Sequence, residues 1–406
     1  MRRKKKNNLI PKHIMRHLVA TLFFLIFSNI LHVYGIEIDG INYNISGDEA
    51  MVIQWTFDDT KTYSGDVVIP ESVTYDGKDY SVTSISSYAF KGCDKLTSIT
   101  IPNSVTTIGY GAFKDCSCLS AINLAPSVVR IYHNAFSGTP WYDNLPDGMV
   151  YVGKVAYKYK GEMPEGTHLS IKEGTLSITE QAFALCSGLV SVTIPEGITT
   201  IEELAFGGCS SLVSVKLPES LTSIGSSVFY DCVSLSSIDI PSGTAKIGSG
   251  AFARCRSLSS ITIPEGSWYI YPNTFSGCVN LAAVVLPESL RNIDSFAFMD
   301  CSGLQSIVCN MPTPPSYGQL VFYGVDKQNC KLYVPKGCEE AYRNAGEWKD
   351  FNIMEMGTGI NEVKSEKYDD AIYDLSGRKV DFQFSTFNSQ FRKKGIYIQN
   401  GKKVLF

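Results

Sequence analysis

Apolar and small residues recur along most of the chain with a spacing of 23 residues, as in the step from Phe229 to Phe252 (252 − 229 = 23). Phe136 keeps this spacing with Thr139 in the place of a cysteine, and the next phenylalanine, Phe183, follows after 183 − 136 = 47 residues, two periods plus one. A fixed period of this length predicts a solenoid, in which one structural unit is stacked many times. The remaining repeats of the series each carry a Phe-x-x-Cys pair: Phe90/Cys93, Phe113/Cys116, Phe183/Cys186, Phe206/Cys209, Phe229/Cys232, Phe252/Cys255, Phe275/Cys278 and Phe298/Cys301.

One repeat, residues 221–243, shows how each unit is expected to fold. Phe229, Cys232 and Leu235 are spaced by three, which indicates a short helical or 3₁₀ turn with one buried edge. The stretch Ile238-Asp239-Ile240 alternates, which predicts a very short strand whose central residue faces outward. Ordering each residue costs about 1–2 kcal/mol, more than the few apolar side chains of one unit offset. We therefore expect stacked units to bury each other's faces.

The residues Ala251–Pro264 follow the pattern Ala-Phe-x-x-Cys-x-x-Leu-x-Ser-Ile-x-Ile-Pro. This pattern resembles the 23-residue leucine-rich repeats of bacterial surface proteins called BspA-like, over about Tyr80 to Cys309. The insert Pro140–Gly161 also recurs in such proteins. The resemblance implies an α/β solenoid of stacked parallel short strands and short helical turns, flanked by β caps and a small C-terminal β module. It also implies a non-catalytic protein that binds host or neighbouring-cell macromolecules outside the cell.

The chain is expected to divide into five parts, the first of them a signal peptide at 1–35. Residues 1–17 are basic and Leu18–Leu31 is almost wholly apolar, which is typical of a cleaved leader, with an uncleaved membrane anchor as the alternative. No second long apolar run follows, so we expect no transmembrane segment after leader removal. The other parts are an N-terminal β cap (36–80), the solenoid (81–311, with an insert at 140–161), a C-terminal cap (312–355), and a linker with a small β module (356–406).

The last of these parts resembles the C-terminal sorting modules of Bacteroidetes surface proteins. That resemblance implies attachment to the cell surface through the C-terminal module. The expected location is therefore secreted or on the outer-membrane exterior of a Gram-negative bacterium.

Charge and histidine content exclude several functional classes. The formal charge is 36 − 40 = −4, and because the leader carries seven basic and no acidic residues, the rest of the chain has 29 − 40 = −11. So acidic a chain disfavours nucleic acid as a partner. Of five histidines, only His133 and His168 lie beyond the leader, and they form no recognisable motif. We therefore expect no metal, no cofactor and no His-dependent catalysis.

The chain has twelve cysteines, and eight of them occupy one repeat position. Stacked units place equivalent Cα atoms about 4.8 Å apart, but parallel Cβ vectors keep the Cβ atoms beyond the usual disulfide range of about 3.5–4.5 Å. We therefore predict a ladder of buried free thiols, with Cys309 also in the core. Cys330 and Cys338 in the exit cap are the one pair retained as a candidate disulfide.

Strand alternation predicts a hydroxyl-rich, nearly neutral stripe on the concave sheet, and the irregular insert is a second candidate for recognition. The first hypothesis is adhesion to a protein partner, and the alternative is a glycan-capturing accessory protein, for which exposed coplanar aromatics along the insert would be the discriminating feature. An enzyme is a third, disfavoured hypothesis, because it would need clustered acids in a cleft. The candidate partner-binding residues are His168, Thr193, Lys216, Asp239, Thr262, Val285 and Val308 on the stripe, with Trp141 and Tyr142 in the insert.

Overall fold

The computed structural model describes residues 35–54 and 62–356, together with the strands at 372–374, 379–380, 396–399 and 402–405. The chain forms two compact units, Met1–Leu145 and Pro146–Phe406, and each is described by itself. The predicted signal peptide, apart from Gly35, and most of the predicted linker lie outside the described residues.

Unit 1 begins as an antiparallel β cap and continues as parallel ladders. One sheet has the order β1-β2-β3-β6-β8-β10, with β5 on β6, and the other has the order β4-β7-β9. The sheet of the cap is continuous with that of the repeats, because β3 pairs in parallel with β6. The elements are β1 (Ile36–Ile38), β2 (Ile41–Ser46), β3 (Glu49–Val52), β4 (Ser64–Val68), β5 (Ser72–Tyr75), β6 (Lys78–Ile85), β7 (Lys95–Ile101), β8 (Thr107–Ile108), β9 (Ala121–Leu124), β10 (Arg130–Ile131) and α2 (Pro140–Asp143).

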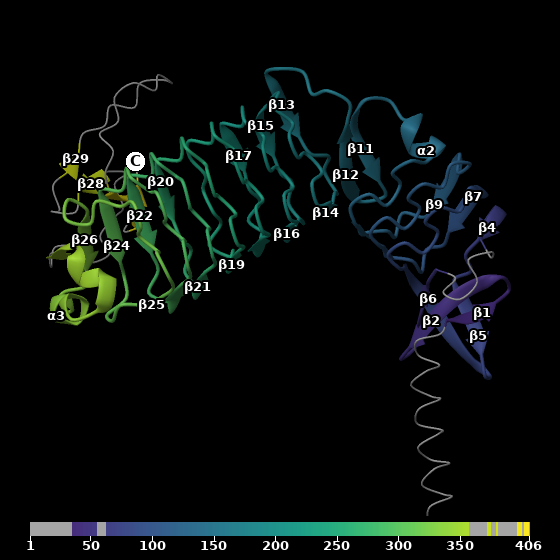
Figure 1. The fold of residues 1–406 in the computed structure, drawn as a ribbon, viewed down its shortest axis with the longest axis horizontal. Coiled ribbons are helices and arrows are strands. Elements are labelled where there is room, and N and C mark those ends of the chain that lie inside the picture. Colours follow the sequence, from purple (N-terminus) through teal and green to yellow (C-terminus); the bar gives the residue numbers. More distant parts are fainter. Residues whose placement is uncertain are drawn as a thin grey trace, which may run out of the picture. The chain divides into compact units, whose positions relative to one another are not determined.

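Unit 2 opens with the antiparallel hairpin β11 (Gly148–Val152) and β12 (Val155–Lys160) and continues as two parallel ladders (Figure 1). The long-strand ladder contains β13 (Thr167–Ser170), β15 (Leu189–Thr193), β17 (Ser214–Lys216), β20 (Ser260–Thr262), β22 (Ala283–Leu286), β24 (Ser306–Cys309), β26 (Lys331–Val334) and β27 (Asn352–Glu355). The short-strand ladder contains β14 (Ser177–Ile178), β16 (Thr200–Ile201), β18 (Ser223–Ile224), β19 (Lys246–Ile247), β21 (Tyr269–Ile270), β23 (Asn292–Ile293) and β25 (Ser316–Tyr317).

Most parallel strand pairs of unit 2 are offset by one repeat of 23 residues, as Val192 is from Val215 in the long-strand ladder and Ile201 from Ile224 in the short-strand ladder. The predicted solenoid of stacked parallel short strands is thus confirmed. Near its end the unit adds α3 (Glu339–Arg343) and the 3₁₀ helix η1 (Gly346–Asp350), and a separate antiparallel sheet is formed by β28 (Ile372–Asp374), β29 (Lys379–Val380), β30 (Ile396–Gln399) and β31 (Lys402–Leu405).

A column of stacked phenylalanine rings forms the centre of the core. In unit 2, neighbouring rings from Phe183 to Phe322 have centroids 5.0–5.7 Å apart and are nearly parallel. Phe322 follows Phe298 after 24 residues and was not part of the predicted series. Trp348 closes this column edge-on against Phe322 at 5.2 Å. Each ring thus covers the next, and the last is covered by a residue of the C-terminal cap.

The segments around the phenylalanines are turns rather than the helical turns that the spacing predicts. Phe229, Cys232 and Leu235 do form one buried edge, as expected. However, the residues two before and two after the phenylalanine, Ser227 and Asp231, have φ of 53° and 55°. This left-handed pair recurs around every phenylalanine of the series, from Tyr88 and Gly92 at the first to Leu320 and Gly324 at the last, and L-residues in that region cannot continue a right-handed helix.

The short strand predicted at Ile238–Ile240 is absent, and the long-strand ladder breaks there between β17 and β20. The alternation persists, because Ile238 is buried while Asp239 is exposed. A strand this short contributes few hydrogen bonds. The repeats stay in register through turn contacts, including the bond from Ser259 N to Ser236 O at 3.2 Å.

The predicted ladder of buried free thiols is confirmed: every cysteine is unpaired, and the eight of the Phe-x-x-Cys pairs are buried except Cys186, which is half-buried. Each central thiol donates to the phenylalanine carbonyl of the preceding repeat, as Cys232 does to Phe206 at 3.2 Å and Cys255 to Phe229 at 3.1 Å. The thiols therefore join successive repeats. Cys309 lies in the core as expected, whereas the candidate disulfide between Cys330 and Cys338 does not form.

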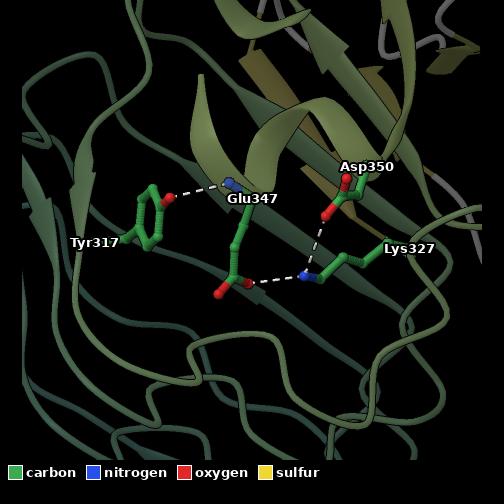
Figure 2. Close-up of polar contacts among 4 residues, drawn as sticks. All are labelled: Tyr317, Lys327, Glu347 and Asp350. Carbon is green, nitrogen blue, oxygen red and sulfur yellow. Dashed lines mark hydrogen bonds and ion pairs between the residues drawn. The ribbon is translucent and has the colours of Figure 1, made fainter. Parts of the chain in front are cut away.

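Polar contacts fix the 3₁₀ helix η1 to the segment that carries Phe322, the last ring of the column (Figure 2). The Tyr317 hydroxyl accepts a hydrogen bond from the backbone N–H of Glu347 at 3.0 Å. Lys327 Nζ lies 2.8 Å from Glu347 Oε2 and 3.8 Å from Asp350 Oδ2. Gly346 has to be glycine, because a Cβ there would lie 1.7 Å from the Tyr317 hydroxyl oxygen. These contacts hold Trp348 over the end of the ring column.

Candidate binding surface

The first five residues of the predicted stripe lie on one face of the long-strand ladder. His168, Lys216, Asp239 and Thr262 are exposed, and Thr193 is half-buried. Their strand neighbours on the other face, such as Val192 and Val215, are buried in the core. Alternation therefore places these five side chains outward, on five successive repeats.

Contacts between repeats order two of these side chains. His168 Nδ1 lies 2.7 Å from the Ser191 hydroxyl one repeat later, and Thr193 pairs in register with Lys216. Lys216 also favours the ionised form of the nearby Glu196, whose pKa is lowered chiefly by bonds from the backbone N–H groups of Glu219 and Ser220. The accessible stripe thus combines one lysine, one aspartate and one histidine with two threonine hydroxyls.

The two apolar members of the predicted stripe are not available to a partner. Val285 is 5% exposed and Val308 is fully buried, and they pack together against Tyr333 and Met356. The prediction that Val285 and Val308 contact a partner was therefore wrong. Alternation put them on the correct face, but it could not show that the C-terminal strands and the segment after them cover that face.

The two aromatic residues proposed in the insert serve packing. Trp141 is half-buried against Phe136, with ring centroids 4.9 Å apart and planes tilted by 59°. Tyr142 is also half-buried, and burial raises the pKa of its phenol. Trp141 thereby closes the phenylalanine column of unit 1, so neither ring offers the exposed coplanar platform that a glycan site in the insert would need.

Thr139 explains why the insert begins where it does. Its hydroxyl donates to Phe136 O at 2.8 Å and accepts from Tyr142 N at 3.2 Å, which caps α2. The Thr139 hydroxyl, which stands in the cysteine position, therefore caps a helix and does not donate to the phenylalanine carbonyl of the preceding repeat. In unit 2 the hairpin strand β12 supplies the missing repeat, since Tyr159 N donates to Ala182 O at 2.8 Å in the manner of a core phenylalanine.

Unit 1 contains a shallow groove that sequence reasoning did not anticipate, with a volume of about 500 Å³. It is lined by Glu49 and Met51 of the cap, by Tyr132 of a repeat and by hydroxyl residues of β6 and β8. Thr83 donates to the Glu49 carboxylate at 3.2 Å. These residues meet only because β3 pairs with β6, which no local sequence signal indicates.

Two further properties were assessed on the described part of the chain. No group of three or more histidine, cysteine, aspartate or glutamate side chains is arranged there to hold a metal ion. Likewise, none of the helices within residues 35–54 and 62–356 is long and apolar enough to cross a membrane.

The parallel ladders, the buried leucines and phenylalanines and the outward polar stripe define a leucine-rich-repeat solenoid. The chain belongs to the family of BspA type leucine-rich repeat regions, whose model matches in 6 copies at residues 71–163, 150–282 and 269–368. No curated protein matches the chain.

Solved structures with a similar fold include a leucine-rich repeat protein from Bacteroides ovatus, with 25% identity, coverage of 80% of this chain and 100% of that chain, and a TM-score of 0.33. A leucine rich cell surface protein from Faecalibacterium prausnitzii has 22% identity, coverage of 70% and 94%, and a TM-score of 0.31. The pneumococcal vaccine antigen PcpA has 15% identity, coverage of 80% and 99%, and a TM-score of 0.34.

Proposed function

We propose that this chain is an exported, surface-exposed repeat protein that binds a protein partner outside the cell through the exposed face of its long-strand ladder. The observation that carries the proposal is that four successive repeats, from Thr193 to Thr262, present an accessible polar side chain at the same position, with His168 two residues off that position in the repeat before them. Regular arrays of this kind suit one large partner, because each repeat adds a contact in a fixed direction.

The accessible stripe is shorter than alternation alone suggested. Without Val285 and Val308 it covers five repeats, or four steps of about 4.8 Å, which is roughly 19 Å. A partner would meet hydroxyls, one lysine and one aspartate, so specificity would come from hydrogen bonds and a single charge pair. We therefore expect an affinity that depends on few residues, as is usual for protein interfaces.

Binding through the stripe is tested with the double variant Thr193→Glu and Lys216→Glu. The two side chains are register partners, so the variant replaces one cationic spot by two carboxylates without touching the core. Binding to immobilised extracellular matrix proteins should weaken by at least about tenfold. Lys336→Glu makes the same lysine-to-glutamate replacement in an exposed turn outside the stripe. It serves as the control and should leave binding unchanged.

The competing location is the insert, whose hairpin turn exposes Gly153 and Lys154. Binding residues often concentrate on irregular segments held by a rigid scaffold. Lys154→Glu should have no effect if the stripe is the site. Loss of binding in Lys154→Glu, with full binding in the stripe double variant, would move the site to the insert.

Export is supported by the basic and apolar leader and by the expectation attached to the family. Surface attachment is proposed to depend on the C-terminal module. Deleting residues 368–406 should leave the solenoid folded but place the protein in the periplasm instead of on the surface. Unchanged protease accessibility on intact cells would show that the module has another role.

A further inference from the structure

The outward positions of the short-strand ladder are small or flexible in two successive repeats and aromatic in the next. The segments 222–225 and 245–248 read Thr-Ser-Ile-Gly and Ala-Lys-Ile-Gly, whereas 268–271 reads Trp-Tyr-Ile-Tyr. The isoleucine is the only residue of the four that all three segments share, and it is buried each time. Trp268 is 66% exposed, and Tyr269 and Tyr271 are half-buried. Core packing therefore does not explain why this repeat departs from its neighbours.

The aromatic segment lies at a break in the short-strand ladder. β19 pairs with β18 and β21 pairs with β23, but β19 and β21 belong to different sheets. In the preceding repeat, Gly248 N donates to Ile224 O at 2.8 Å. The equivalent bond, from Tyr271 N to Ile247 O, is not formed among the described residues. Backbone groups are rarely left unpaired away from water, so this seam must admit water or the polar groups of a ligand.

The seam is local, because the two repeats are joined on both sides of it. Before it, the Ser267 hydroxyl donates to Thr244 O at 3.3 Å. After it, Gly250 N donates to Pro272 O at 3.0 Å. The ladder hydrogen bonds are thus interrupted over about four residues and resume on the far side, so the seam is an interruption within the stack and not its end.

The side chains at the seam hold one another in place. The rings of Tyr269 and Tyr271 meet edge to face, with centroids 4.7 Å apart. Lys246 Nζ lies 5.9 Å from the Tyr271 ring centroid. The Tyr269 hydroxyl donates to the Asp294 carboxylate, and this bond lowers the pKa of Asp294 and raises that of Tyr269. Little ordering of these groups is therefore needed when a ligand binds.

We propose that this seam, formed by Lys246, Trp268, Tyr269, Tyr271 and Asp294, binds a neutral carbohydrate chain. The face of an aromatic ring is negative and attracts the weakly positive C–H groups on one face of a sugar ring. Sugar hydroxyls both donate and accept hydrogen bonds, so they suit the Lys246 ammonium, the Asp294 carboxylate and the unpaired backbone groups of the seam. This site lies on a different ladder from the stripe, so it is independent of the proposed protein binding.

The charge and the extent of the seam favour a neutral sugar over a polyanionic glycan and over a protein partner. Lys246 is matched by Asp294, so a polyanionic glycan would gain one attraction and suffer one repulsion. A standard protein interface buries about 800 Å² on each partner, an area that would extend over several repeats. The aromatic replacement is confined to one repeat, which suits a short stretch of a thin chain.

The test is affinity electrophoresis of the full chain in gels that contain dextran, mannan, laminarin or, as a polyanion, chondroitin sulfate. The variant Trp268→Thr, Tyr269→Ser and Tyr271→Gly restores the sequence of residues 222–225 and should keep the fold. At least one neutral polysaccharide should retard the unmodified protein, and the variant should bind it at least about tenfold more weakly. Tyr323→Ser removes another exposed ring, 57% accessible, and should change nothing.

Several outcomes would overturn the proposal. These are no retardation of the unmodified protein by any of the three neutral polysaccharides, equal retardation of the triple variant, or retardation by chondroitin sulfate alone. If the triple variant does not fold, Trp268→Thr alone, at an exposed position, carries the same test. Loss of matrix-protein binding in the triple variant would make the seam a protein site. The stripe variant Thr193→Glu and Lys216→Glu should retain carbohydrate binding, which separates this proposal from the preceding one.

Discussion

Replacing Phe229 by alanine tests whether the ring column holds the solenoid of unit 2 together. Phe229 is fully buried, and its ring lies 5.6 Å from that of Phe206 and 5.5 Å from that of Phe252. Its N–H bonds to Ala251 O, and its C=O accepts from the Cys255 thiol. Alanine keeps both backbone bonds, so the substitution removes only the side chain and its packing.

The expected loss has two separable parts. Truncating a buried phenylalanine to alanine costs about 3–5 kcal/mol of unfolding free energy through lost transfer and the cavity that remains. Each aromatic pair adds about 0.5–1.5 kcal/mol beyond its buried area, so the two pairs of Phe229 contribute about 1–3 kcal/mol of that total. Phe229→Leu keeps most of the apolar volume but no ring, and we expect it to cost about 1–3 kcal/mol.

Urea unfolding of the full chain, followed by circular dichroism and tryptophan fluorescence, measures both variants. Tyr323→Ala, at an exposed ring, is the control and should change the unfolding free energy by less than about 0.5 kcal/mol. Because repeat arrays are coupled between neighbours only, Phe229→Ala should also broaden the transition as the flanking repeats unfold separately. A loss below about 1 kcal/mol, or equal losses for alanine and leucine, would refute the role assigned to the column.

The remaining predictions concern the thiols and the backbone. Alkylation of native protein should label the exposed Cys118 first, with all twelve cysteines labelled after denaturation; mass mapping that found bridges between repeat cysteines would contradict this. Burial raises the pKa of Cys232 to about 12. The buried protonated thiol therefore contributes its full stability below about pH 8.5, and this contribution is lost toward pH 12 at about 1.4 kcal/mol per pH unit. The urea midpoint of the unmodified protein should fall above pH 9, and that of Cys232→Ala should fall less steeply. Leu185 has φ 63°, so Leu185→Gly should stabilise by about 1 kcal/mol, and a destabilised variant would show that the strain is absent. Gly346→Ala should destabilise by more than about 2 kcal/mol, since its Cβ would overlap the Tyr317 hydroxyl; an unchanged urea midpoint would refute the close contact.

Much of the solenoid could be predicted because its period constrains every residue. The spacing of Phe-x-x-Cys identified the buried edge, and alternation placed Val192 inward and Thr193 outward. The turns were predicted as helical because a spacing of three cannot distinguish a helix from successive turns. The residue two after each phenylalanine carries the missing signal, since it is most often glycine or aspartate, as at Gly208 and Asp231, and both tolerate a left-handed backbone.

The binding surface was harder to predict, because exposure depends on segments far apart in the chain. Val285 and Val308 follow the alternation rule and are still buried, since Tyr333 and Met356 pack on them. Trp141 looks like an exposed recognition residue in the sequence, but it closes a ring column. Trp268 could have been found, because comparison of its repeat with the two before it shows an aromatic residue where none is needed for packing.

The choice between a thiol and a hydroxyl after each phenylalanine links the fold to where the protein is proposed to act. Cys116 reaches back to Phe90 O of the preceding repeat, whereas Thr139 bonds to Phe136 O of its own repeat and starts α2. The Cys116 thiol therefore links its repeat to the preceding one, whereas the Thr139 hydroxyl makes no such link and instead caps the helix α2. Free thiols are uncommon in an oxidising compartment, but the thiolate is the reactive form, and burial strongly raises the pKa of thiols such as Cys255. Burial thus keeps thiols such as Cys255 in the less reactive protonated form, which is compatible with the export proposed for the protein.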